Sequence, residues 1–67
     1  MIIKINTEYI KLNQLLKFSG AVLSGGEADV VIREGKVLLN GEICTMRGKK
    51  IRGGDTVKVG DTVIEVV

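Results

Sequence analysis

The spacing of the apolar residues changes near Gly35, and this change restricts the possible folds more than any other feature. Between Leu12 and Gly35, apolar residues recur at intervals of three and four positions, the repeat of one face of an α-helix. After Gly35 they lie in short runs separated by turns that contain glycine, as in β-strands. Helices followed by strands predict a single α+β domain, with two short adjacent helices packed on a small antiparallel-rich sheet.

The first helix is predicted over residues 12–19. Leu12, Leu15 and Leu16 fall on one of its faces. Gly20 follows as a C-terminal cap, because glycine adopts the left-handed backbone conformation without strain.

The second helix is predicted over residues 24–34 and has the clearer start signal. Its first residues match a capping box. In this motif the Ser24 hydroxyl accepts a hydrogen bond from the Glu27 amide, and the Glu27 carboxylate reaches back to the cap. Its apolar stripe consists of Ala28, Val31 and Ile32.

Short strands are predicted on both sides of the helices. Residues 1–5 are rich in β-branched side chains and predict a strand that we expect to pair with the last one, while residues 6–9 form a polar turn. After the helices, Asn40-Gly41 joins strands predicted over residues 37–39 and 42–44, because this dipeptide is a strong hairpin signal.

The rest of the chain is predicted to contain a basic loop, a turn and a second hairpin. The loop spans residues 45–50 and the turn residues 52–55. The second hairpin pairs residues 56–59 with residues 62–66 around Gly60-Asp61. We therefore expect one domain over residues 1–67, with one core formed by Leu12, Leu15, Leu16, Ala28, Val31, Ile32, Val37 and Val57.

Missing residue types exclude several chemistries. The chain has no histidine and only one cysteine, so imidazole catalysis, an internal disulfide and a cysteine-cluster zinc site are impossible. We expect Cys44 to be a small buried hydrophobe in a strand, because a nucleophilic thiol would lack a histidine base. A lone thiol also suits a cytoplasmic protein.

The size of the chain argues against a deep ligand site. A domain this small buries only about 60% of the surface that its unfolded chain exposes, which leaves no room for a substrate cavity. No apolar run is long enough to span a membrane, and residues 1–5 do not resemble a signal peptide. We expect no cofactor, no metal, no small-molecule substrate and no membrane association, and we expect a monomer.

Lysines and arginines concentrate in three groups, although the net charge is only +2. The groups lie in the first helix, at the end of the second helix, and in the loop 47–52, which has no acidic residue. Their members are Lys11 and Lys17, then Arg33 and Lys36, then Arg47, Lys49, Lys50 and Arg52. If the helices pack at the sheet edge that holds this loop, the three groups converge and can bind a phosphate backbone.

Aromatic residues are scarce in this chain. Tyr9 and Phe18 are the only two, too few for the stacking platforms of proteins that bind single strands. We expect Phe18 in the core or at a helix edge, and we expect any nucleic acid to be read through its backbone and shape.

The order of several short motifs resembles the RNA-binding domain named after small-subunit ribosomal protein S4. The similarity covers about residues 11–59, and the spacing of the pieces is more specific than any one of them. The resembling segments are residues 11–17, 24–28, 31–37, 40–42 and 50–55. It implies the αL motif, two helices on a small bent sheet, and binding of structured, possibly ribosomal, RNA in a small stand-alone protein.

The resemblance also implies which residues contact RNA. It places the helix pair and the adjoining hairpin against the RNA, with Lys11 where the family usually has arginine. Ser24 would face a phosphate at the start of the second helix, although it serves equally well as a cap. The implied contacts are Lys11, Lys17, Ser24, Arg33, Lys36, Asn40, Arg47, Lys49, Lys50 and Arg52.

The chain departs from the family pattern at two positions. Many members have a basic residue where this chain has Gly25, and another where it has Asp29. A carboxylate at residue 29 repels phosphate, so affinity is expected to be weak or the contact surface to lie toward the loop 47–52.

Two other classes compete with RNA binding. A ubiquitin-like sulfur carrier or another protein-interaction adaptor shares the short strands and the Asn-Gly hairpin, but residues 64–67 form a strand instead of a mobile diglycine tail. An enzyme is disfavoured, because Asp55 and Asp61 fit turns and Gly25-Gly26 lacks the context of a phosphate-binding loop.

Overall fold

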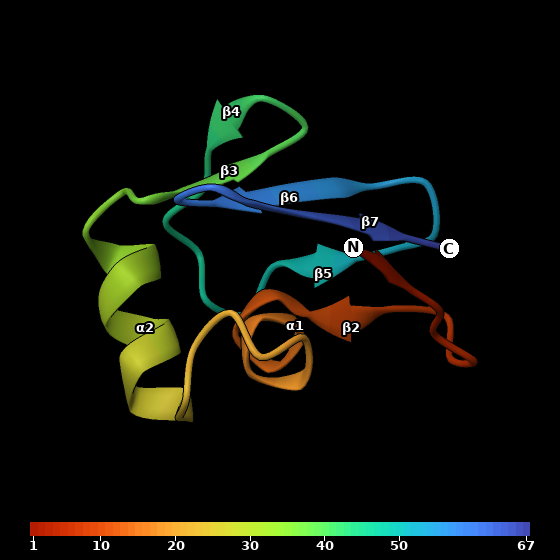
Figure 1. The fold of residues 1–67 in the computed structure, drawn as a ribbon, viewed down its shortest axis with the longest axis horizontal. Helices are drawn as coiled ribbons and strands as arrows, with labels where there is room; N and C mark the ends of the chain where they lie inside the picture. The colour runs from red at the N-terminus through yellow and green to blue at the C-terminus, as the bar shows by residue number, and fades with distance from the viewer.

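The chain folds into two helices, a five-stranded sheet and a two-stranded ribbon (Figure 1). The computed structural model describes residues 1–67. In chain order the elements are β1 (Ile2–Ile3), β2 (Ile10–Lys11), α1 (Leu12–Phe18), α2 (Gly25–Arg33), β3 (Val37–Leu39), β4 (Glu42–Ile43), β5 (Lys50–Ile51), β6 (Thr56–Val59) and β7 (Thr62–Val66). Both helices lie on the same side of the larger sheet, so the predicted α+β class and the adjacent helix pair are confirmed.

The larger sheet has the strand order β1-β7-β6-β3-β4. Its hairpins β3–β4 and β6–β7 are antiparallel, as predicted, and only β1 pairs parallel to its neighbour. That neighbour is β7, with Ile2 opposite Glu65. The predicted pairing of the first and last strands is therefore confirmed, and it places the two ends of the chain side by side.

The Asn-Gly turn between β3 and β4 forms as predicted. Asn40 has a φ of 50° and Gly41 a φ of 87°, the pair of left-handed conformations that a two-residue hairpin turn requires. The Asn40 side chain also joins this turn to the next one, because its amide nitrogen donates to Asp55 at 3.1 Å. Its oxygen accepts from the Thr56 backbone N–H at 2.9 Å.

The ribbon of β2 and β5 was not predicted. The sequence reading gives residues 6–9 as a turn and residues 45–50 as a loop, but Ile10 pairs with Ile51 and Lys11 with Lys50. Strands of two residues are too short to show an alternating pattern, and the partners lie far apart in the sequence. Only the folded chain brings them together.

Capping interactions define the ends of both helices. The Ser24 hydroxyl accepts from the Glu27 backbone N–H at 3.1 Å, which confirms the N-cap of α2. The second half of the predicted capping box differs, because the Glu27 carboxylate accepts from the Leu23 backbone N–H at 3.3 Å and not from that of Ser24. Gly20 and Gly35 adopt positive φ just after the two helices, as expected.

Eleven residues form the core between the helices and the sheet. Seven of the eight predicted core residues are fully buried, and Val31 is half-buried against the others. The additional members are Val22, Ile51, Ile64 and Val66. One prediction needs correction, because Cys44 is only half-buried and lies just after β4. Of the two places expected for Phe18, the structure shows the helix edge, since Phe18 is exposed at the end of α1.

The helices have seven and nine residues, and neither is long and apolar enough to cross a membrane.

Candidate nucleic-acid interface

The basic loop lies against the start of α1. The backbone N–H of Leu12 donates to the Lys49 carbonyl at 2.9 Å, and that of Asn13 donates to the Arg47 carbonyl at 3.0 Å. Lys11, the N-cap of α1, makes no side-chain cap, so the loop carbonyls satisfy amides that begin the helix. These bonds hold the loop 47–50 beside the helix pair.

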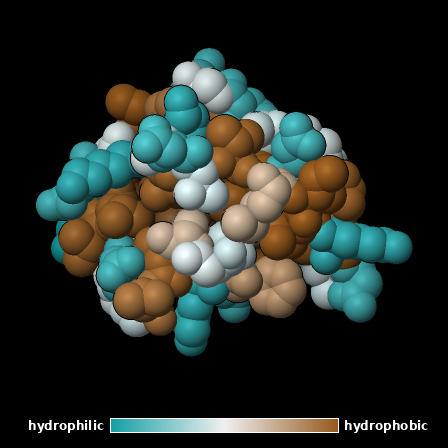
Figure 2. Space-filling model, viewed as in Figure 1, coloured by the Kyte–Doolittle hydropathy of each residue, from teal (hydrophilic) through white to brown (hydrophobic).

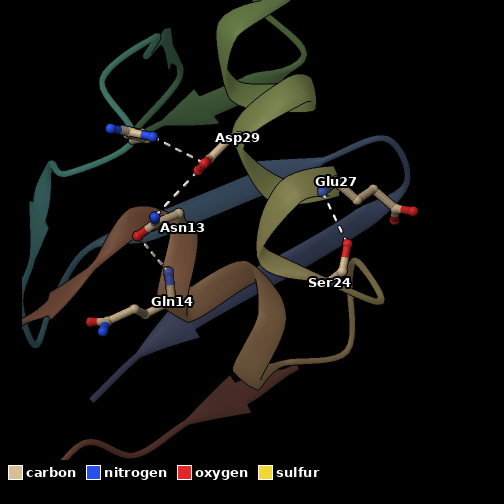
Figure 3. A network of polar contacts seen from close by, with 6 residues as sticks. Asn13, Gln14, Ser24, Glu27 and Asp29 are labelled. Carbon is tan, nitrogen blue, oxygen red and sulfur yellow. Dashed lines mark hydrogen bonds and ion pairs between the residues drawn. The ribbon is translucent and has the colours of Figure 1, made fainter.

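Asp29 on α2 connects this loop to both helices (Figure 3). One of its carboxylate oxygens accepts from the Arg47 guanidinium at 3.2 Å, and the other accepts from the Asn13 side-chain amide at 3.3 Å. The Asn13 oxygen in turn accepts from the Gln14 backbone N–H at 2.9 Å. Side-chain exposure is 28% for Asp29 but 72% for Arg47, so most of the guanidinium remains open to solvent.

Arg33 joins Arg47 in an open cleft beside Asp29. The cleft, called the basic cleft below, is lined by Asp29, Arg33 and residues 45–48. Asp29 and Arg33 are four positions apart on α2 and therefore lie on the same helical face. Two guanidinium groups converging from a helix and a loop can bind a phosphate with paired, charge-assisted hydrogen bonds. Asp29 reduces the positive charge available for such a contact.

A second basic group lies on the ribbon of β2 and β5. Lys11 and Lys50 are directly paired across it. Like charges in directly opposed positions destabilise a sheet, so this pair favours a role in binding an anion over a role in stability. Lys50 Nζ also lies 5.0 Å from the centre of the Tyr9 ring, and the Arg52 guanidinium carbon lies 5.9 Å from it.

The remaining expected contacts lie apart from these two groups. Lys36 pairs with Glu34 at 3.2 Å, and both side chains are exposed. Lys17 lies beside Ile10, Gln14 and Phe18 in a shallow hollow. Lys49 lines a different hollow, formed mainly by residues 42–46.

The Asn40 side chain forms hydrogen bonds within the fold. Its side chain bonds to Asp55 and to the Thr56 backbone N–H, which uses one of its two amide N–H groups and one of its two acceptor positions. The Asp55 carboxylate also accepts from the Arg52 backbone N–H at 2.8 Å. This backbone bond, followed by the bond from Asn40, lowers the pKa of Asp55 below its ordinary value. Both residues therefore organise the turn 52–55.

Hydrophilic side chains project around the rim of the face shown in Figure 2, with apolar surface exposed between them. The exposed large apolar residues include Ile43 and Met46, which flank the loop. This face therefore consists of hydrophilic areas separated by apolar ones, not one continuous polar patch.

Sequence reasoning missed Tyr9 and Asn13 as parts of this region. Tyr9 lay in a predicted turn, and its contact with Lys50 depends on the unpredicted ribbon. Asn13 sits on the polar face of α1, which gave no sign that it would bond to Asp29 on α2. The sequence predicts that Asp29 repels phosphate, and the structure shows in addition that Asp29 binds Arg47.

Ser24 can be tested as a cap and as an RNA contact with two substitutions. Ser24→Ala should lower the free energy of unfolding by about 0.5–2 kcal/mol, because α2 loses its capping acceptor. Ser24→Asp should keep the stability near that of wild type, because aspartate caps equally well. Urea denaturation measures both values.

The same aspartate variant tests RNA contact. A phosphate at the start of α2 would be repelled by Ser24→Asp, whereas a purely structural cap predicts unchanged RNA affinity. We expect unchanged affinity, because Ser24 forms no contact with the basic cleft or the ribbon. Weaker RNA binding at unchanged stability would show that the helix start contacts the RNA.

Comparison with known proteins agrees with this fold. In sequence, the chain is 42% identical over 57 residues to the "Probable ribosome maturation protein RlbA" of Bacillus subtilis, a match that covers 85% of this chain and 80% of RlbA. It is 36% identical over 59 residues to YbcJ of Escherichia coli, covering 88% and 84% of the two chains. It also matches the dual-specificity RNA pseudouridine synthase RluF of Escherichia coli at 41%, but over only 19% of that enzyme.

The structure and the family model extend this similarity to nearly the whole chain. The solution structure of YbcJ, described as revealing an αL motif involved in RNA binding, superposes with a TM-score of 0.77 at 31% identity. The superposition covers 98% of this chain and 85% of YbcJ. The family model for the S4 domain matches residues 3–67. The chain therefore belongs to the S4 domain family.

Proposed function

We propose that this protein binds structured RNA, through the basic cleft and the basic ribbon, and that it has no catalytic activity of its own. One observation carries the proposal: the loop 47–52 is bonded to the start of α1 and places Arg47 beside Arg33. The same segment contains β5, which places Lys50 beside Lys11. Basic residues from distant parts of the sequence thus gather on either side of one loop.

The similar proteins support the same function. YbcJ contains an αL motif described as involved in RNA binding, and RlbA is named a "Probable ribosome maturation protein". We propose ribosomal RNA as the ligand on this basis, with the protein acting as a cytoplasmic monomer. The likeness to RluF covers only 19% of that enzyme and gives no support for synthase activity in this chain.

The charge balance suggests a small number of phosphate contacts. The net charge is +2, and Asp29 and Glu34 each pair with one basic residue. The unpaired basic groups of the cleft and ribbon are Lys11, Arg33, Lys50 and Arg52, with Arg47 partly available and Lys49 in the neighbouring hollow. About four to six phosphate contacts would give a slope of log affinity against log salt of roughly −3 to −5.

The salt dependence of binding tests the proposal. A fragment of ribosomal RNA with a defined stem and loop should bind with this slope, and Arg33→Ala or Lys50→Ala should each reduce its magnitude by nearly one. Because backbone contacts position a protein without reading sequence, the losses should be similar for different structured RNAs. Fluorescence anisotropy of labelled RNA at several salt concentrations measures the slopes.

Lys58→Ala provides the matched control. Lys58 is exposed on β6 and alternates with the buried Val57, so it lies on the face of the sheet away from the helices. The Lys58→Ala substitution removes one positive charge, as Arg33→Ala and Lys50→Ala do, but outside the proposed interface. It should therefore leave the slope of log affinity against log salt unchanged. If no structured RNA binds in a salt-sensitive way, the proposal is wrong and the adaptor alternative is favoured.

A further inference from the structure

The outer face of the ribbon combines an aromatic ring with three basic side chains. Ile10 and Ile51 are paired and point toward the core, with Ile51 fully buried. Side chains alternate between the two faces of a strand, so the flanking residues of both strands lie on the opposite, outer face. These residues are Tyr9, Lys11, Lys50 and Arg52.

The charges on this face are not balanced by ion pairs. The two ion pairs of the structure involve Lys36 and Arg47, and neither belongs to the ribbon. The nearest carboxylate after β5 is that of Asp55, which accepts from the Arg52 backbone N–H and from Asn40 and attracts the Arg52 side-chain charge without forming an ion pair. Along β2 the adjacent acid is Glu8, which is exposed and makes no hydrogen bond or ion pair. The basic side chains are therefore available to an anion.

The Tyr9 ring is positioned under these cations. Lys50 Nζ is 5.0 Å and the Arg52 guanidinium carbon 5.9 Å from the ring centre, both within the range of cation–π attraction. The Tyr9 carbonyl accepts from the Thr7 hydroxyl at 2.9 Å, which orders the turn that precedes the ring. The half-buried ring thus has a defined place among the cations.

We propose that this outer face binds one unpaired nucleotide that flanks the structured RNA, with its base stacked on Tyr9 and its phosphates held by Lys11, Lys50 and Arg52. The inference rests on the proposed RNA-binding function and extends it to a single-stranded ligand. A base is a flat π surface, so it competes with Lys50 and Arg52 for the face of the Tyr9 ring. When the base displaces the Lys50 ammonium, that ammonium remains close enough to pair with the phosphate of the same nucleotide.

Continuity with the basic cleft favours RNA over other anions. Arg47 in the cleft and Lys50 and Arg52 on the ribbon belong to one run of six residues. A strand leaving a stem bound at the cleft can therefore continue along the same loop to Tyr9. A single ring suits a single base, which agrees with the scarcity of aromatic residues elsewhere in the chain.

The fluorescence of Tyr9 provides a direct test. The chain has one tyrosine and no tryptophan, so its intrinsic fluorescence reports on Tyr9 alone. The probes are an RNA hairpin with blunt ends and the same hairpin with a short single-stranded adenosine overhang. The overhang should quench Tyr9 and raise the affinity about fivefold to a hundredfold, as expected for one base–aromatic stack. Free N-acetyltyrosinamide corrects for light absorbed by the RNA.

Substitutions separate stacking from folding. Tyr9→Phe should keep the advantage of the overhang, because phenylalanine retains the ring. Tyr9→Leu should lose that advantage and bind both hairpins with equal affinity. Thermal unfolding followed by circular dichroism checks that each variant is folded, and the wild-type quenching does not depend on any variant.

The failure of this inference is distinct from the failure of RNA binding itself. If the blunt hairpin binds with the expected salt dependence but the overhang neither quenches Tyr9 nor adds affinity, the stacking site does not exist and the proposed function stands. Quenching by poly-glutamate but not by the overhang would assign the face to an acidic protein partner and overturn the inference. If neither hairpin binds, both proposals fail.

Discussion

Replacing Asp29 by asparagine should strengthen the binding of structured RNA about tenfold and make it more sensitive to salt, because one phosphate contact is gained. Asp29 now holds the Arg47 guanidinium at 3.2 Å and places a negative charge in the basic cleft. Asparagine removes that charge and frees Arg47 for phosphate. The slope of log affinity against log salt should become steeper by nearly one.

The same substitution should change stability little. An exposed ion pair contributes only about 0–1 kcal/mol, and most of Arg47 is open to solvent. An asparagine side chain can still accept the hydrogen bond from Asn13, so the contact between the helices is preserved. Fluorescence anisotropy measures affinity, and urea denaturation of the same samples measures the free energy of unfolding.

Glu65→Gln is the control for net charge. Glu65 lies exposed on β7 between the buried Ile64 and Val66, on the face of the sheet away from the helices. The Glu65→Gln substitution changes the net charge by the same amount as Asp29→Asn and should leave RNA affinity nearly unchanged. Weaker RNA binding by a stably folded Asp29→Asn protein would contradict the prediction, and would mean that Asp29 positions Arg47 for its contact with RNA.

Shortening Ile32 to alanine should lower the free energy of unfolding by about 2–5 kcal/mol. Ile32 is fully buried between α2 and the rest of the core, so the loss combines the transfer of apolar atoms with the cavity that they leave. A domain of 67 residues has a total stability of only about 3–10 kcal/mol. The Ile32→Ala substitution should therefore remove a substantial part of the total stability.

Val30→Ala is the matched control on the same helix. Its side chain is 40% exposed, and the change also replaces a β-branched residue with alanine. Because alanine is the better helix former and little apolar surface is lost, stability should stay within about 0.5 kcal/mol of wild type. Equal losses at the two positions, measured by denaturant unfolding, would show that α2 does not pack through Ile32.

The predictions for the site depended on different kinds of information. Grouping of the basic residues in the loop 47–52 was visible in the sequence, and Arg33 and Arg47 do meet in one cleft. The family resemblance assigns Asn40 to RNA, and the structure adds a role in the fold, because its side chain bonds to Asp55 and to the Thr56 backbone. A sequence reading cannot separate a polar side chain that binds a ligand from one that bonds to a neighbouring turn, because both lie at the surface.

The sequence by itself determined the features that depend on neighbouring residues. Helical spacing, the Ser24 cap and the left-handed Asn40-Gly41 turn arise from interactions within a few positions of the chain, and all are present. The two antiparallel hairpins of the larger sheet follow for the same reason, since short turns bring their strands together.

Tertiary structure alone decided the contacts between distant segments. The ribbon, the bond of the loop carbonyls to α1 and the pairing of Asp29 with Arg47 each join residues that are separated by a helix or more. No local pattern encodes them, because a two-residue strand or a single carboxylate has the same appearance whether or not a partner is near. The place of Tyr9 beside Lys50 and Arg52 also depends on the ribbon. Because Ile10 and Ile51 pack toward the core, the neighbouring side chains of both strands point outward together.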